Sequence, residues 1–135
     1  MTNSHKYSAT THDVIVNVSP RYLEDQSKPE ENHYVWAYDV EIINTSDETI
    51  QLKERSWTIT DASGVVEKVH GPGVVGEQPI LKAGDSFRYS SGCPLPTSSG
   101  IMVGSYLMAC ESGQKIDVAI PAFSLDMPRA QITVN

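Results

Sequence analysis

The strongest constraint on the fold is a period-two alternation of apolar and polar side chains, which is clearest between residues 33 and 44. The large apolar side chains of this segment recur at every second position, as on one face of an extended strand; they are Tyr34, Trp36, Tyr38, Val40 and Ile42. No stretch of ten or more residues keeps a helical apolar repeat before a Gly, Pro or polar turn cluster interrupts it. The pattern therefore predicts an all-β chain.

Segments with β-type residues occur along the whole chain, separated by turns and loops. They span residues 14–18, 33–44, 50–60, 65–69, 86–90, 101–110 and 115–125. Polar turn clusters lie at residues 44–47, 61–64, 82–85 and 111–114, and longer loops are expected at residues 22–32 and 91–100. Because turns rather than helical crossovers join these strands, the sequence favours an antiparallel β-sandwich of about seven strands over a parallel α/β fold.

The size and charge of the chain bound its organisation. Its 135 residues allow one domain, which we place at residues 12–127, between a flexible N-terminal segment at 1–11 and a C-terminal tail at 128–135. The net charge of −7 argues against binding to nucleic acid or to an anionic membrane surface. No apolar run approaches the ~20 residues of a membrane span. The first eleven residues are polar where a signal peptide would be apolar, so we expect a cytoplasmic protein.

Residues 71–76 read Gly-Pro-Gly-Val-Val-Gly and match the GxGxxG pattern of dinucleotide-binding folds. In those folds a long helix follows the third glycine, whereas here a turn at 82–85 leaves no room for one, so that class is excluded. Two interpretations stay open. The backbone N–H groups around Gly71, Gly73 and Gly76 could form a nest for a pyrophosphate group, or the glycines could supply positive φ where the chain crosses between sheets.

A phosphate nest would gain from positive side chains that offset the charge of the bound anion. The candidate cationic neighbours are Arg55, Lys68 and Lys82, and His70 and Arg88 are further candidates. Which of them lie near the glycines depends on how the strands pair.

Nothing in the sequence indicates catalysis or a resident metal ion. The four histidines, at positions 5, 12, 33 and 70, stand at none of the short spacings of a zinc site, and the acidic residues lack the pattern of a calcium loop. No nucleophile elbow is present, and Cys93 and Cys110 do not form a CxxC pair. We therefore expect two free thiols, no catalytic residue, no metal site, no cofactor and a protein that is not an enzyme.

Several longer runs of residues carry a resemblance to a known family. These runs are Tyr34-Val-Trp-Ala-Tyr38, Arg55-Ser-Trp57-Thr-Ile59, Gly71-Pro-Gly-Val-Val-Gly-Glu-Gln-Pro-Ile-Leu81, Met102-Val-Gly104-Ser-Tyr106-Leu-Met108 and Ile120-Pro-Ala-Phe123-Ser-Leu125. Together they cover most of residues 14–128 in order, and they resemble the signature of the ApaG family. One departure is Ala83, where the family more often has a proline before the glycine of the turn.

This resemblance implies a fibronectin type III-like, or immunoglobulin-like, β-sandwich. Such domains occur alone in bacteria and as appended domains in eukaryotic F-box proteins and in a DNA polymerase delta-interacting protein, which suggests binding rather than catalysis. The bacterial family is associated with cobalt resistance and magnesium efflux. Its glycine loop is described as similar to a pyrophosphate-binding motif, and by position that role falls on Gly71, Gly73 and Gly76.

Two functions from different classes follow from these observations. The first is a non-enzymatic interaction module that presents a loop end or an exposed sheet edge to a protein partner. The alternative is the binding of a small phosphate-containing molecule, such as a pyrophosphate or a nucleotide, at residues 71–76. Direct binding of Mg²⁺ or Co²⁺ is a third, weaker hypothesis that only the resemblance invites.

Overall fold

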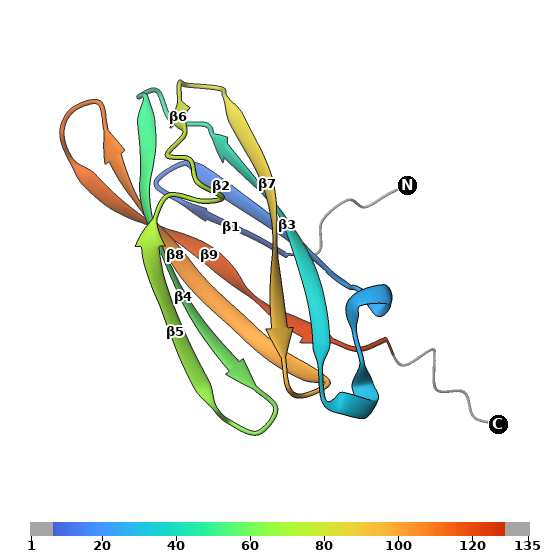
Figure 1. Ribbon diagram of the computed structural model, residues 1–135. Helices are drawn as coiled ribbons and strands as arrows, with labels where there is room; N and C mark the ends of the chain where they lie inside the picture. The colour runs from blue at the N-terminus through green and yellow to red at the C-terminus, as the bar shows by residue number, and fades with distance from the viewer. Residues whose placement is uncertain (1–6, 129–135) are drawn as a thin grey trace.

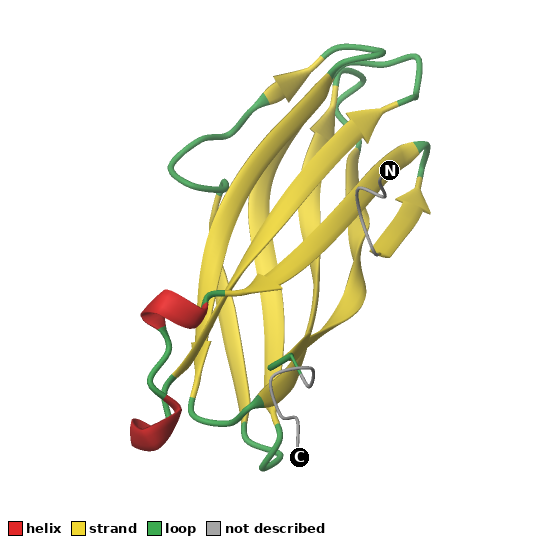
Figure 2. Cartoon of the chain, turned by 90° about the vertical axis from the view of Figure 1, so that its right-hand side faces the viewer, coloured by secondary structure: helices red, strands yellow, loops and turns green. Residues whose placement is uncertain are grey.

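The computed structural model describes residues 7–128 and is a sandwich of two antiparallel sheets (Figure 1). The first sheet has the strand order β1 (Tyr7–Thr11), β2 (Val14–Tyr22), β3 (Tyr34–Asn44) and β7 (Ser86–Leu95). The second has the order β5 (Val66–Pro72), β4 (Ile50–Asp61), β8 (Ser99–Cys110) and β9 (Lys115–Asp126), with β6 (Ile80–Leu81) paired to β4. Within residues 7–128 the helical elements are two 3₁₀ turns, η1 (Glu24–Gln26) and η2 (Pro29–Glu31), which Figure 2 shows at one end of the sandwich. The predicted all-β antiparallel sandwich is confirmed.

The core lies between the sheets and contains the side chains that the alternation placed on one face. On β3, Trp36, Val40 and Ile42 are at most 2% exposed, and on β9 Val118 and Phe123 are buried just as deeply. Fully burying a large apolar side chain contributes about 1.5–3 kcal/mol to the stability of the fold. Apolar residues at every second position therefore indicate which face of each strand is buried.

The two long sides of the sandwich differ. On one side β9 lies against β1 and β2, and hydrogen bonds cross between the sheets there. The Tyr7 hydroxyl lies 3.2 Å from Ser124 Oγ, and the Ala119 N–H donates to Thr11 Oγ1 over 3.2 Å. On the other side are β7 and β5, the remaining edge strands of the two sheets. The glycine-containing loop between β5 and β6 extends toward β7 on this side, which we call the open edge (Figure 1).

The structure corrects the expected organisation of the N-terminal part. Residues 1–11 were expected to be a flexible segment, but residues 7–11 form β1, paired with β2 along its whole length. The short polar run Tyr-Ser-Ala-Thr-Thr gives little apolar signal, and its order comes from tertiary contacts: Tyr7 packs on Phe123 with ring centroids 6.0 Å apart. Residues 1–6 and 129–135 lie outside the described part of the chain, as does nearly all of the expected tail at 128–135.

Other strand boundaries also differ from those predicted from the sequence. The loop expected at 91–100 is shorter, because β7 continues to Leu95 and β8 begins at Ser99. The two-residue strand β6 was not expected, and it forms because Ile80 and Leu81 pair with Gln51 and Ile50 on β4. Residues 7–128 thus form nine strands, where the sequence predicts about seven.

Candidate functional site

A pocket of about 340 Å³ opens at the open edge of the sandwich, between β4, β7 and the loop after β5. Its lining residues are Tyr38, Arg55, Trp57, Pro72, Val74, Val75, Gly76, Tyr89 and Ser91. The volume is at the lower end of the range for small-molecule sites in proteins. We call this hollow the edge pocket.

Arg55 faces the interior of the sandwich because of a β-bulge in β4. The register of β4 against β8 shifts between Leu52 and Glu54, so that Arg55 pairs with the buried Tyr106. By period two, Arg55 then shares a face with Trp57, whose side chain is only 4% exposed. The bulge therefore places the guanidinium of Arg55 at the rim of an apolar core. From the sequence alone, one can see only that Arg55 lies two positions before Trp57 and so shares its face of the strand.

The guanidinium of Arg55 has neither a carboxylate partner nor a full set of acceptors among residues 7–128. Its Nη1 donates to the carbonyl oxygens of Pro72 and Gly73 over 3.0 and 2.9 Å, and no other acceptor is found for its Nε and Nη2. The other two arginines of the described chain are ion-paired. A partly buried charge without a counter-charge is costly, and an anion that paired with Arg55 would offset this cost.

Hydroxyl groups of the first sheet form the opposite wall of the edge pocket. Tyr38 and Ser91 both line this wall, and the hydroxyls of Tyr89 and the buried Tyr106 are hydrogen-bonded to one another. The Tyr89–Tyr106 pair has two hydroxyl protons and uses one internally, which leaves one proton to donate. Burial raises the pKa of Tyr38 and of Tyr89, so both stay protonated at neutral pH and act as neutral donors.

The loop itself is a tight two-residue hairpin rather than an open nest of N–H groups. Val74 and Glu77 exchange two backbone hydrogen bonds of 2.8 Å each, and the Gly73 N–H donates to the carbonyl of Lys53 over 2.9 Å. The central residues Val75 and Gly76 have φ angles of 42° and 82°, as in a type I′ turn. Their N–H groups donate to no acceptor in the described chain, so both are available to a ligand.

The three glycines of the motif occupy their positions for different physical reasons. Gly73 and Gly76 have positive φ, of 61° and 82°, whereas a Cβ on Gly71 would lie 3.2 Å from Nη1 of Arg55. Gly71 therefore makes room for the Arg55 side chain to cross β5 and reach the loop. All three glycines and Arg55 are candidate site residues predicted from the sequence, and the structure brings Arg55 into contact with the loop.

The other candidate cations do not line the edge pocket. Lys68 pairs with Thr58 and is exposed, and Lys82 follows β6 in the turn that Asp85 closes by accepting the Lys82 N–H. His70 is hydrogen-bonded to Ser56 and lies 3.3 Å from a carboxylate oxygen of Glu54. Arg88 is paired with Glu41.

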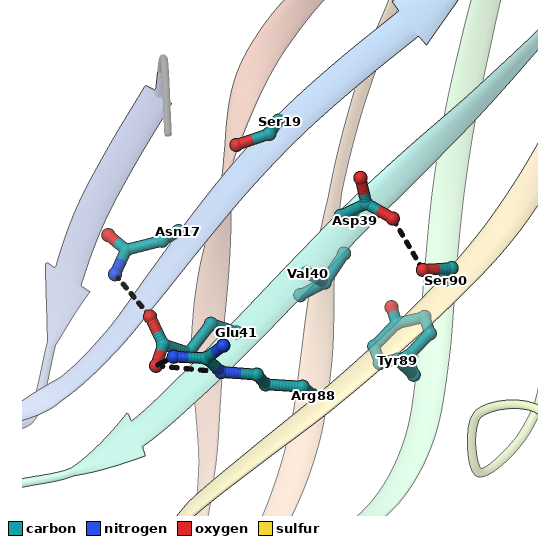
Figure 3. Close-up of a pocket in the computed structure, with 8 residues that line it drawn as sticks. All are labelled: Asn17, Ser19, Asp39, Val40, Glu41, Arg88, Tyr89 and Ser90. Atoms are coloured by element: carbon teal, nitrogen blue, oxygen red, sulfur yellow. Dashed lines mark hydrogen bonds and ion pairs between the residues drawn. The ribbon is translucent and has the colours of Figure 1, made fainter. Parts of the chain in front are cut away.

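A second hollow, of about 390 Å³, lies on the outer face of the first sheet, and it contains an ordered array of polar side chains (Figure 3). Its lining residues are Asn17, Ser19, Asp39, Val40, Glu41, Arg88, Tyr89 and Ser90. The charges in this array are matched, because Arg88 pairs with Glu41 over 2.9 Å and Arg21 pairs with Asp39 over 3.0 Å. The hydrogen bond from Arg21 holds the pKa of Asp39 below its ordinary value. The only buried side-chain nitrogen or oxygen without a hydrogen-bond partner in the described chain is Asn17 Oδ1. This amide oxygen is uncharged, so the second hollow lacks the uncompensated charge of the edge pocket.

The remaining titratable groups form no further site in residues 7–128. No group of three or more His, Cys, Asp or Glu side chains in this part of the chain could hold a metal ion. Cys93 and Cys110 are free thiols, as predicted, and burial raises the pKa of Cys93 to about 11. No helix within this part of the chain is long and apolar enough to cross a membrane.

Comparisons with known proteins agree with the residue pattern. The family model described as the ApaG domain matches residues 24–110. Proteins named Protein ApaG from Brucella anthropi and Paramagnetospirillum magneticum are 60% and 58% identical over 129 residues, which are 96% of this chain and 99% of each relative. The crystal structure of a putative ApaA protein from Bordetella pertussis has a TM-score of 0.85 and 47% identity, covering 89% of this chain and 98% of that one. The chain therefore belongs to the ApaG family.

Proposed function

We propose that this ApaG-family protein is a cytoplasmic, non-catalytic binding module that holds a phosphate-containing anion in the edge pocket. The observation that carries this proposal is the partly buried guanidinium of Arg55, which has two free donor nitrogens and no carboxylate partner among residues 7–128. Arginine presents its N–H groups as a planar fork that fits two oxygens of one phosphate.

The surroundings of Arg55 supply further donors and no competing negative charge. The hydroxyls of Tyr38, Tyr89 and Ser91 line the pocket together with the unpaired N–H groups at the tip of the hairpin. None of the residues that line the pocket is acidic. A site built from one cation and several neutral donors selects an anion. The chain as a whole has a net charge of −7, which makes a positively charged pocket an exception on its surface.

Titration of the ¹⁵N-labelled protein with inorganic phosphate, pyrophosphate and ATP tests the proposal. We expect the amide shifts to cluster at residues 72–76 and 89–91, with a shift of the Arg55 Nε–H signal. Arg55→Gln should weaken pyrophosphate binding about 10- to 100-fold, because it removes a charge-assisted hydrogen bond. Arg88→Gln is the matched control, since Arg88 is exposed and already paired with Glu41. Spectra that stay unchanged at millimolar ligand, or equal effects of the two variants, would refute the proposal.

A protein partner is the second candidate function, and a specific surface favours it. On the outer face of the second sheet, Val66 and Ile101 flank Thr60 in one cross-strand row, and Val103 lies beside Thr58 in the next. These valine and isoleucine side chains are 41–53% exposed. An apolar strip of this kind, beside the free edge of β5, suits the docking of another protein by its sheet or by an added strand.

Affinity purification with the wild-type protein and with Ile101→Lys separates these functions. A partner that is lost with Ile101→Lys but kept with Arg55→Gln supports protein docking on this face. Recovery of the same proteins with all three baits contradicts it. Under either function, we propose that binding rather than a chemical reaction connects such a protein to cobalt resistance and magnesium efflux.

A further inference from the structure

Val75 has a backbone conformation that its side chain disfavours. Its φ angle of 42° lies in the left-handed region, where a β-branched residue is a genuine outlier, and asparagine or glycine is the usual occupant of this position in a type I′ turn. The side chain is 55% exposed, so burial in the core does not compensate for the strain. Val75 is therefore a locally unfavourable choice for the stability of the free protein.

The structure around Val75 enforces this conformation. The preceding residue, Val74, is 1% exposed and anchors the loop in the core, and it closes the turn with Glu77 through two hydrogen bonds. Arg55 donates a hydrogen bond to the carbonyl oxygen of Gly73, and the side-chain amide of Gln78 donates to the backbone carbonyl oxygen of Lys53 over 2.9 Å. A loop fixed from several sides can keep one strained residue in place, and strain of this kind clusters at ligand clamps.

The strained side chain of Val75 lines the edge pocket together with polar side chains. Val75, Pro72 and Trp57 supply apolar surface to the same hollow into which Arg55 and Ser91 bring their polar groups. A bare phosphate ion would use the polar groups alone and would give the exposed valine nothing to contact. The combination fits a ligand with an anionic group on one side and an apolar group directly attached to it.

We infer that Val75 is a specificity-determining contact residue, and that the ligand of the edge pocket is a small organic phosphate ester whose apolar group packs against it. This inference rests on the proposed function, because it requires that the pocket hold a phosphate. The volume of about 340 Å³ suits a small organic molecule.

The test compares three probes of similar charge: inorganic phosphate, methyl phosphate and phenyl phosphate. Dissociation constants are measured by NMR titration for the wild-type protein and for Val75→Asn, which places Asn-Gly at the centre of the turn. We expect the wild-type protein to bind phenyl phosphate roughly five- to tenfold more tightly than methyl phosphate, through apolar contact area. Val75→Asn should abolish this preference, leave the affinity for inorganic phosphate unchanged and raise the thermal midpoint.

Ile80→Asn is the matched control, because Ile80 is 61% exposed on the same segment and does not line the pocket. This variant should keep the preference for phenyl phosphate. If the wild-type protein binds the three probes equally, or if Val75→Asn retains the preference or lowers the thermal midpoint, the inference is wrong while the proposed function stands. If the wild-type protein binds none of these three probes but binds pyrophosphate or ATP, the inference is wrong while the proposed function stands. If it binds none of the three probes and neither pyrophosphate nor ATP, the proposed function fails and this inference fails with it.

Discussion

Replacing each glycine of the 71–76 motif by alanine should give three different losses of stability, because each glycine meets a different constraint. At Gly73 the new Cβ would lie 2.2 Å from the carbonyl oxygen of Glu77, in a residue with φ of 61°. At Gly76 φ is 82° but the Cβ would meet open space. At Gly71 φ is not positive, and the nearest atom is Nη1 of the flexible Arg55 side chain at 3.2 Å.

The expected magnitudes follow from these distances and angles. Gly73→Ala combines a left-handed alanine, at about 1–2 kcal/mol, with a backbone clash that costs about 1–3 kcal/mol, for a loss of about 2–5 kcal/mol in the free energy of unfolding. Gly76→Ala keeps only the first contribution and should lose about 1–2 kcal/mol. Gly71→Ala should lose less than about 1 kcal/mol, because the end of a long side chain can move.

Urea unfolding followed by tryptophan fluorescence measures these losses, provided that the dependence on urea is the same for all variants. The order of loss should be Gly73→Ala, then Gly76→Ala, then Gly71→Ala. The three variants should rank differently when their loss of phosphate affinity is compared. Gly71→Ala should displace Arg55 and weaken phosphate binding with little loss of stability. Equal losses at Gly73 and Gly76, or the largest loss at Gly71, would refute this reasoning.

Three further predictions concern the core, the thiols and one ion pair. Phe123→Ala should lower the free energy of unfolding by about 3–5 kcal/mol in the same urea assay, because the ring is 1% exposed in the core. With a thiol reagent at pH 8, the partly buried thiol of Cys110 should react well before the buried thiol of Cys93, whose pKa of about 11 and deeper burial keep it protonated and inaccessible; faster labelling of Cys93 would contradict the structure. Because the hydrogen bond from Arg21 lowers the pKa of Asp39 below 3.8, the stability from this pair is present above pH 3.8 and is lost as the pH falls through the lowered pKa. A ¹³C carboxyl titration should show a midpoint below 3.8 that rises in Arg21→Gln, and the effect on stability should be modest since both side chains are about half exposed.

The fold was predictable for the segments in which apolar and polar residues alternate along the chain. Alternation on the segment 33–44 identified the buried face of β3, because the period of two depends only on the extended backbone. β1 shows no such alternation, because Tyr7 is its single large apolar residue and its order depends on Phe123, far away in the sequence. β6 could not be predicted either, because it is too short to show a period.

The candidate site was only partly predictable. The glycine motif was recognisable from its spacing, and Arg55 was named among its cationic neighbours. That Lys68 and Lys82 lie outside the pocket depends on strand pairing and on turn geometry. The hydroxyl wall could not be identified from sequence, because Tyr38 and Tyr89 have the periodicity of ordinary core residues and their hydroxyls are brought to the pocket by the packing of one sheet on the other.

The sequence by itself determined the class of fold, the buried faces of the long strands and the places where the chain turns. These properties arise from interactions between residues close together along the chain, so a single sequence contains them. The tertiary structure alone decided that the β5 and β7 side stays open, that a bulge turns Arg55 inward without an acidic partner, and that Val75 is held in a strained turn. These features depend on which strands become neighbours and in which register, and that choice is made by the core as a whole.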